Sequence, residues 1–345
     1  MSILIAILAL ALLIVLHEAG HFLVARLCGM RVERFSIGFG NAIASFKRGD
    51  TTYQIAPVPL GGFVQITGMN PHEDFDRNDP HVYPNRPRWM RLLVLLAGPA
   101  ANYLTAVLLS LVVLLGWGRV TGTTTVDEVI QGSAAEQAGL HVGDVLAEVN
   151  GTKVDTPAAI TQMVRSSEGA ALAFKVMRNG APQTLSISPR KDGPGATYMI
   201  GVRFGQVRER GAVGPSIKEA FIWPYSISTM LVGNIADMIT GKVKGSLTGP
   251  VGIAREMATA AQQGVLKFLE LLILLSCALA VFNLLPIPAL DGGRALFLTV
   301  SAAIRRDLNP RVEATVHMVG MGLLLLLLIF VTYNDVKQII LKFVG

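Results

Sequence analysis

The sequence predicts a polytopic α-helical membrane protein with about four transmembrane helices, a membrane-associated β-hairpin region and an inserted α+β domain. Of the 345 residues, 51% are hydrophobic and only 16% are charged, with a mean hydropathy of +0.50. Soluble globular domains carry nearer to about 25% charged residues. Four apolar runs each approach the roughly 20 residues that a helix needs to cross a bilayer. After the second run the composition changes to that of a soluble domain.

The first apolar run, Ile3 to Leu27, contains the pattern H-E-x-x-H. It has no basic segment before it and no small-residue cleavage site after it, so we expect a retained transmembrane helix rather than a signal peptide. Residues four apart share one helix face, so His17 and His21 can bind one metal ion, and Glu18 can reach the open position of that metal. Ionisable residues are costly inside a membrane span and usually functional there, which favours a metal site over polar residues that only pack between helices.

The segment that follows the first run is predicted to form strands. Thr51 to Ile66 alternates in hydrophobicity and is punctuated by Pro and Gly, and Phe35 to Phe46 is expected to form a partner hairpin. Two interpretations remain open: a small amphipathic sheet that rests on the membrane surface, or an exposed strand edge that pairs with an unwound peptide backbone. The polar stretch from Asn70 to Pro87 comes next, and we expect its two histidines, His72 and His81, at the surface.

The remaining apolar runs extend from Trp89 to Trp117, from Leu266 to Asn283 and from Val312 to Val331. Arginines gather in the loop between the first two runs and in the loop between the last two, so both loops are predicted to be cytoplasmic. The long segment from Gly118 to Gln263 is then extracytoplasmic, and the histidines lie towards the cytoplasmic side. The net charge of +6 is explained by these basic loops. No basic patch with interleaved aromatic residues is present, so no nucleic-acid partner is expected.

The soluble part of the long segment has short alternating strands between Val126 and Pro189. A G-D-V-L turn at residues 143–146 precedes a hairpin on an Asn-Gly turn between Val149 and Val154. This pattern resembles a PDZ domain, a fold that commonly captures chain ends by strand addition, although a steric plug remains the alternative role. Gly214 to Gln263 is expected to form interfacial helices, with a re-entrant or interfacial turn at Ser246 to Ile253.

The chain is accordingly divided into four parts. These are an N-terminal membrane part with the H-E-x-x-H helix (residues 1–118), the PDZ-like domain (119–205), an amphipathic or interfacial linker (206–264) and a C-terminal membrane part (265–345).

A catalytic zinc ion usually has three protein ligands and an open position, so two histidines are insufficient. The best third candidate is Asp291, which follows Pro286 and Pro288 and precedes two glycines. Broken backbone at membrane depth is tolerated where it lines a cavity. The alternative is that Asp291 only caps the next helix. His317, in the fourth run, is expected to form a hydrogen bond between helices.

Three ordered motifs carry a family resemblance: H-E-A-G-H at 17–21, G-P-A-A-N at 98–102 and N-L-L-P-I-P-A-L-D-G-G at 283–293. Together they resemble the site-two protease family of intramembrane zinc metalloproteases. The PDZ-like segment and L-T-G-P-V-G-I at 247–253 make the chain most similar to the bacterial RseP-like branch, although it has one such domain where the best-known members have two. The resemblance implies zinc bound by His17, His21 and Asp291, with Glu18 as the catalytic residue. It also implies substrate-binding residues: Asn283, Pro286, Pro288, Tyr53, Gly61, Gly62 and Asn102.

The sequence thus predicts an intramembrane zinc metalloendopeptidase of the bacterial cytoplasmic membrane. The resemblance implies single-span membrane proteins as substrates, either anti-sigma factors shortened outside the membrane or remnant signal peptides. The expected partners are these substrates, the lipid bilayer, and a peptide or exterior substrate segment at the PDZ-like domain. One alternative is an inactive membrane PDZ scaffold that retains the metal site, which an intact Glu18 disfavours. The other is a metal transporter, which would need ionisable residues along a path rather than at one depth.

Overall fold

The computed structural model describes residues 2–70, 73–76, 78–191, 197–242, 249–306 and 308–344. The chain forms two compact units. The first unit combines Met1–Leu114 with Ala212–Gly345, and the second is Leu115–Gly211. Each unit is described by itself below.

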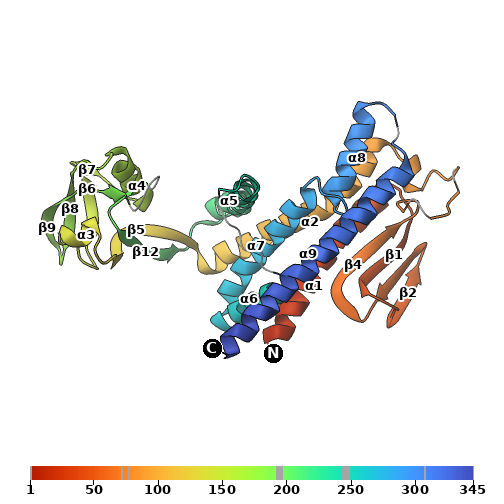
Figure 1. The fold of residues 1–345 in the computed structure, drawn as a ribbon, viewed down its shortest axis with the longest axis horizontal. Helices are drawn as coiled ribbons and strands as arrows, with labels where there is room; N and C mark the ends of the chain where they lie inside the picture. Colours follow the sequence, from red (N-terminus) through yellow and green to blue (C-terminus); the bar gives the residue numbers. More distant parts are fainter. Residues whose placement is uncertain are drawn as a thin grey trace. The chain divides into compact units, whose positions relative to one another are not determined.

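The first unit is mainly helical (Figure 1). Its helices are α1 (Ser2–Leu27), α2 (Arg88–Trp117), α5 (Val213–Ile239), α6 (Pro250–Gln263), α7 (Val265–Leu284), α8 (Asp291–Ala303) and α9 (Pro310–Val344), with a 3-10 turn at Tyr83–Asn85. Over the described residues, four stretches are long and apolar enough to cross a membrane: Ser2–Leu27, Arg88–Trp117, Val265–Leu284 and Arg311–Lys337. The four spans predicted from the sequence are therefore confirmed in length and composition.

Helices α1 and α2 approach each other closely where small residues meet. A Cβ atom at Gly20 of α1 would clash with the carbonyl oxygen of Ala97 and lie 2.7 Å from the Cβ of Ala101, both in α2. Small residues at such crossings let helix backbones come into contact, which is how helices pack where no hydrophobic effect drives them together. This crossing lies one turn or less from both histidines of the H-E-x-x-H pattern.

Helices α5 and α6 pack against the apolar helices. Ala220 of α5 is buried with Val107 and Leu114 of α2, and Met257 of α6 is fully buried with Leu13 of α1. The expected interfacial segment is thus helical in its described part.

The turn expected at Ser246 to Ile253 lies partly outside the described residues, since only the part from Gly249 onwards is described. Helix α6 begins at Pro250, a residue well suited to the first helical position. The backbone N–H groups of Gly249 and Gly252 donate to the carboxylate of Asp335 in α9, at 3.3 and 2.8 Å. A carboxylate at a helix N-terminus is electrostatically favourable, so this motif joins α6 to α9.

A four-stranded sheet, visible beside α1 in Figure 1, follows the first helix. Its strands are β1 (Val32–Phe39), β2 (Ala44–Arg48), β3 (Thr51–Ile55) and β4 (Val58–Ile66), in the order β2-β3-β1-β4. β1 pairs with β3 in parallel and with β4 antiparallel, and β2 pairs with β3 antiparallel.

The hairpin expected over Phe35 to Phe46 is wrong, because β3 lies between β1 and β2. The side chain of Tyr53 in β3 explains this order. Its ring lies between those of Phe35 and Phe46, with centroids 6.2 and 5.0 Å away, and it also contacts Phe22 of α1 at 5.8 Å. Inserting β3 therefore brings the three rings together, with Phe35 and Tyr53 half-buried and Phe46 exposed.

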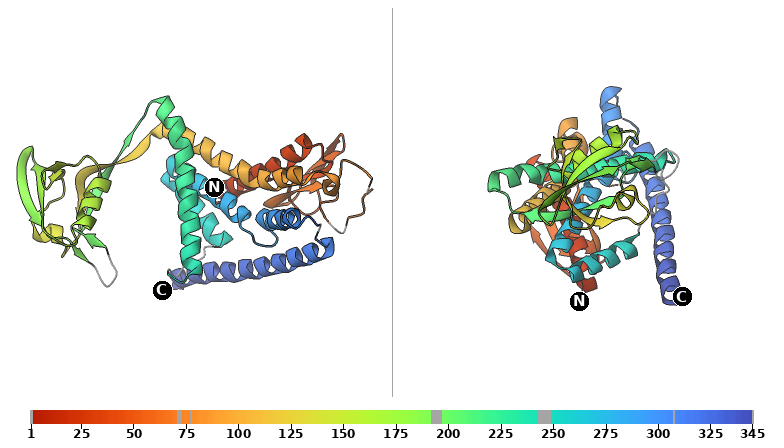
Figure 2. Two further views of the ribbon diagram at one scale, coloured as in Figure 1. Left: turned by 90° about the horizontal axis from the view of Figure 1, so that it is seen from above. Right: turned by 90° about the vertical axis from the view of Figure 1, so that its left-hand side faces the viewer.

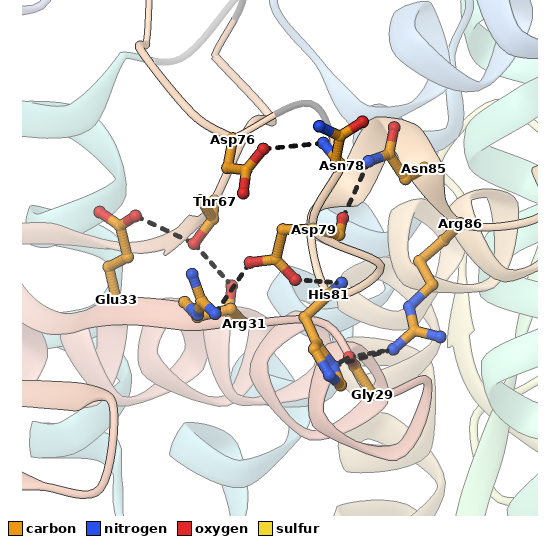
Figure 3. A network of polar contacts seen from close by, with 10 residues as sticks. All are labelled: Gly29, Arg31, Glu33, Thr67, Asp76, Asn78, Asp79, His81, Asn85 and Arg86. Atoms are coloured by element: carbon orange, nitrogen blue, oxygen red, sulfur yellow. Dashed lines mark hydrogen bonds and ion pairs between the residues drawn. The ribbon is translucent and has the colours of Figure 1, made fainter.

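The connector between β4 and α2 is fixed by the polar contacts drawn in Figure 3. Asp79 pairs with Arg31 at 2.8 Å and accepts a hydrogen bond from the backbone N–H of His81 at 2.8 Å. The carbonyl oxygen of Gly29 lies 2.9 Å from Nδ1 of His81 and also accepts from Arg86. His81 is exposed, as expected, whereas His72 lies outside the described residues.

The second unit is a small α+β unit, coloured yellow to green in Figures 1 and 2. Its elements are β5 (Arg119–Val129), α3 (Ala134–Gln137), β6 (Val145–Val149), β7 (Thr152–Lys153), α4 (Pro157–Ser166), β8 (Leu172–Arg178), β9 (Ala181–Ile187), β10 (Arg190–Lys191), β11 (Tyr198–Met199) and β12 (Val202–Glu209). The main sheet has the order β12-β5-β6-β8-β9, with β7 paired to β6. The predicted Asn-Gly hairpin is confirmed: Val149 pairs with Thr152, and both Asn150 and Gly151 have the positive φ that this turn requires.

Candidate metal centre

Helix α1 and the start of α8 bring three metal-binding side chains together. His17 and His21 are one turn apart on the same face of α1 and are both more than nine-tenths buried. Nε2 of His17 lies 3.2 Å from Oδ2 of Asp291, and Nε2 of His21 lies 3.3 Å from the same oxygen. The two Nε2 atoms are 3.2 Å apart. Residues from opposite ends of the sequence therefore present their donor atoms to one point.

Asp291 reaches this point because the backbone breaks between α7 and α8. α7 ends at Leu284, and α8 begins at Asp291. A Cβ atom on Gly292 or Gly293 would clash with carbonyl oxygens of the break, so only glycine permits this tight approach. The N-cap position is Leu290, and it has no side-chain cap. The carboxylate of Asp291 faces the histidines, which differs from the capping role that the sequence left open.

Helix α2 forms the wall behind the imidazoles. A Cβ atom at Gly98 would clash with Nε2 of His21 and would lie 2.7 Å from Nε2 and Cε1 of His17. Pro99, the next residue, has no N–H group and so removes one helical hydrogen bond in this turn. In the same turn the carbonyl oxygen of Val94 lies 2.7 Å from Nδ1 of His21. Gly98 thus leaves just enough room for both rings.

The donor set fits a zinc ion. If Nδ1 of His21 donates to Val94, its Nε2 carries a lone pair towards Asp291. Two imidazole lone pairs and a carboxylate oxygen that face one another repel unless a cation lies between them. Oδ2 of Asp291 is buried and has no hydrogen-bond partner among the described residues. The donor atoms lie within 4.8 Å of one another, and two imidazoles with one carboxylate are a common ligand set of catalytic zinc.

Glu18 lies beside the three donor atoms and faces strand β4. Its side chain is half-buried, and its carboxyl group lies close to the backbone N–H of Val64. A Cβ atom at Gly62, also in β4, would lie 3.4 Å from Cγ of Glu18. Strand β4 therefore borders Glu18, whose carboxylate lies near the metal centre but is not one of the three donor groups.

The substrate-binding residues expected from the sequence lie in several places. Asn283 is in the last turn of α7, where its amide donates to the carbonyl oxygen of Leu279 at 3.0 Å. Pro286 is exposed and Pro288 half-buried in the break before Asp291. The structure thus places these three residues on the segment that delivers Asp291.

The other four expected residues are divided between the sheet and α2. Gly61 and Gly62 are buried in β4, beside Glu18. Tyr53 belongs to the aromatic cluster of β3, separated from β4 by β1. Asn102 is completely buried in α2, and its amide nitrogen lies 3.2 Å from Nδ1 of His17. Asn102 is therefore brought to the metal centre behind His17.

His317 of α9 forms a hydrogen bond to another segment of the helical unit, as the sequence predicted, but its partner is the break before α8. The backbone N–H of Ala289 donates to its Nδ1 at 2.8 Å, two residues before Asp291. Ala289 has a φ of +77°, which is unfavourable for any residue other than glycine. A Cβ atom at Gly320, one turn further along α9, would clash with Pro288. The sequence predicted the hydrogen bond from an ionisable residue inside an apolar run, but it gave no signal for the partner, Ala289.

A small cavity lined by both polar and apolar side chains lies next to His317. It has a volume of about 60 Å³, room for a few water molecules, and is lined by Met69, Tyr83, Arg294, Glu313, Ala314 and His317. Burial raises the pKa of the Tyr83 hydroxyl to about 12, so this group stays neutral and can donate a hydrogen bond at physiological pH. The cavity therefore offers polar groups beside the break that carries Asp291.

Two histidines, the glutamate beside them and a distant aspartate, set in helices long and apolar enough to cross a membrane, form the residue set of a zinc metalloprotease. Residues 5–327 match the model of peptidase family M50, and the chain belongs to this family. It is a zinc metalloprotease, as its relatives are. The zinc metalloprotease RasP of Geobacillus kaustophilus is 29% identical over 95% of this chain and 96% of the relative. A Nostoc relative is 34% identical over 98% of this chain and 97% of its own length.

Solved structures give a weaker likeness. The PDZ domain of an SdrC-like protein from Listeria monocytogenes matches 24% of this chain and 86% of that structure, with 18% identity and a TM-score of 0.22. The corresponding domain from Listeria innocua covers 26% of this chain and 99% of that structure, with 21% identity and a TM-score of 0.23. Scores this low do not establish a shared fold.

Proposed function

We propose that this protein cleaves single-span membrane proteins at a zinc ion held by His17, His21 and Asp291. The observation that carries the proposal is the convergence of these three buried donors, inside apolar helices, with Glu18 beside them. When bound, zinc supplies Lewis-acid catalysis by polarising a peptide carbonyl and activating water. The proposal adds the ligand set and the substrate class to the protease activity of the family.

Glu18 is the general base and then the general acid. It takes a proton from the attacking water and delivers it to the nitrogen of the leaving amine, so that one carboxylate serves both steps. Its place between the donor cluster and β4 supports this role, because a peptide lying along β4 would bring a carbonyl group close to its carboxylate. The cavity beside His317 supports a supply of water to a site that is otherwise lined by apolar helices.

The free edge of β4 binds the substrate as an added strand. Among the described strands β4 pairs only with β1, so its other edge has no strand partner, and the backbone N–H of Val64 in β4 faces the carboxyl of Glu18. A transmembrane helix hides its amide bonds in its own hydrogen bonds, and strand addition exposes them. Gly61 and Gly62 add no side chains of their own to this part of β4; the ring of Phe39 lies against Gly61, and Glu18 lies beside Gly62. Asn283, Pro286 and Pro288 then contact the substrate from the opposite segment.

The protein lies in the bacterial cytoplasmic membrane, with the β1–β4 sheet and the active site towards the cytoplasm. The arginines in the loop between the first two apolar helices, and in the loop between the last two, support this orientation. The inserted unit is then extracytoplasmic, and as a PDZ-like domain it binds or excludes the exterior part of a substrate. Two kinds of substrate fit this arrangement: membrane-anchored anti-sigma factors already shortened outside the membrane, and remnant signal peptides.

The test is the release of a fragment from a tagged single-span substrate that lacks its exterior domain, co-expressed with wild type or with Glu18→Gln. We expect release by the wild type and a loss of about 10²- to 10⁴-fold in the variant, with zinc content unchanged. Glu256→Gln, at an exposed glutamate of α6, is the matched control and should behave like the wild type.

Equal release by wild type and Glu18→Gln would remove Glu18 from the mechanism. If the wild type cleaves soluble peptides but none of several single-span proteins, the proposed substrate class is wrong, while the protease activity stands.

A further inference from the structure

Each zinc-binding histidine needs a hydrogen-bond acceptor at its second ring nitrogen. A neutral imidazole has one N–H and one lone pair, so a ring that binds metal through Nε2 carries its hydrogen on Nδ1. His21 has a built-in acceptor, the carbonyl oxygen of Val94, 2.7 Å from its Nδ1. A backbone carbonyl can only accept, so this contact fixes the tautomer of His21 without ambiguity.

His17 has no such backbone acceptor among its described contacts. The group that faces its Nδ1 is the side-chain amide of Asn102, 3.2 Å away. An amide can face the ring with either its nitrogen or its oxygen, and the two orientations fix opposite tautomers. With the nitrogen facing the ring, Nδ1 must accept, and Nε2 then carries a hydrogen that blocks a metal. With the oxygen facing the ring, Nδ1 donates and Nε2 is free to bind.

The surroundings of Asn102 permit the second orientation. The residue is completely buried, and its Oδ1 has no hydrogen-bond partner among the described residues. Exchanging the amide oxygen and nitrogen therefore breaks no other hydrogen bond. The backbone at this position is fixed independently, because the hydroxyl of Ser276 in α7 donates to the carbonyl oxygen of Asn102 at 2.8 Å. The side chain thus has a fixed origin and, among the described residues, one hydrogen-bond neighbour, His17.

We infer that Asn102 is a positioning residue that sets the tautomer of His17 by accepting a hydrogen bond from its Nδ1, and that it is not a substrate contact. This inference rests on the proposed ligand set. It also explains why the site uses an amide within an apolar helix: the buried acceptor stays uncharged, so no extra negative charge is placed beside Asp291 and Glu18.

The test compares the zinc affinity of the purified full-length protein in detergent, by competition with a chelator of known affinity. Asn102→Leu keeps the size of the side chain and removes the acceptor, and we expect about 10- to 100-fold weaker zinc binding, the usual effect of losing such a partner. Asn102→Asp can only accept, so we expect it to bind zinc at least as tightly as the wild type. Ser110→Ala, which removes an unpartnered buried hydroxyl of the same helix, is the control and should leave zinc affinity unchanged.

Wild-type zinc affinity in Asn102→Leu overturns the inference, and a raised KM without a change in zinc affinity returns Asn102 to the substrate site. Equal weakening in the Leu and Asp variants, with thermal unfolding as in the wild type, also overturns it, because only the Asp variant keeps an acceptor. His17→Ala separates this result from the ligand set itself. If that variant binds zinc like the wild type, the proposed ligands are wrong, whatever Asn102 does.

Discussion

Replacing Gly98 by alanine is the most direct perturbation of the metal centre, because the change is one methyl group. The new Cβ would lie 2.7 Å from Nε2 of His17, about 0.7 Å inside the 3.4 Å at which ordinary van der Waals contact begins, and it would clash more severely with Nε2 of His21. The alanine methyl cannot turn away, and α2 is held against α1 at the Gly20 crossing. The imidazoles must therefore move by most of this distance.

Such a displacement is large for a metal site. Zinc–nitrogen distances vary by only about 0.2 Å between well-formed sites, so a shift more than three times as large removes at least one ligand from its position. We expect Gly98→Ala to weaken zinc binding by about 100-fold or more and to abolish cleavage at ordinary zinc concentrations. Zinc per protein after purification, followed by chelator competition, measures the effect directly.

Gly116 supplies the matched control, since it lies in the same helix and a Cβ there meets nothing within 4 Å. Gly116→Ala should keep wild-type zinc affinity and gain up to about 1 kcal/mol of helix stability. If Gly98→Ala bound zinc like Gly116→Ala, the close contact between Gly98 and the two rings would not exist in the protein, and the reasoning about this wall would be refuted.

Three further changes test separate parts of the structure. Gly62→Ala places a Cβ 2.6 Å from the carbonyl oxygen of Ser36, so β4 must shift; we expect cleavage to fall about tenfold or more with zinc content unchanged, while Gly322→Ala, with nothing within 4 Å, has no effect. His317→Leu leaves the N–H of Ala289 without its acceptor at a cost of about 1–3 kcal/mol, so we expect zinc affinity to fall roughly tenfold in chelator competition; wild-type affinity would contradict the role of His317. Asp144 is almost fully buried, and the hydrogen-bonded guanidinium of Arg178, at 2.6 Å, holds the pKa of its carboxyl below the ordinary value. The resulting stability of the second unit is complete above about pH 4, the pKa of an unfolded aspartate, and is lost as the pH falls through the lower folded pKa. Limited proteolysis of the full chain between pH 7 and 3 should show this loss, and Asp144→Asn should be less stable by several degrees at pH 7 and lack it; identical pH profiles would disprove the ion pair's contribution.

The sequence by itself determined the features that depend only on which residues are neighbours along the chain. The four apolar spans could be predicted because crossing a bilayer needs a fixed length of apolar helix, and the Asn-Gly turn because only a few residues tolerate its positive φ. The shared face of His17 and His21 follows from the helical repeat alone. Asp291 could also be predicted, because prolines and glycines around a carboxylate in an apolar segment indicate broken backbone that lines a cavity.

Only the tertiary structure decided the features that depend on contacts between segments far apart in the sequence. The strand order β2-β3-β1-β4, with Tyr53 between Phe35 and Phe46, is a pairing that no periodicity reveals. Gly98 and Asn102 contact the histidines of the metal centre, and His317 contacts Ala289 just before Asp291; each contact joins positions 28 to 85 residues apart in the sequence. A residue type limits the bonds that a side chain can make, but the packing of helices selects its partner, and here that packing places Asn102 against His17.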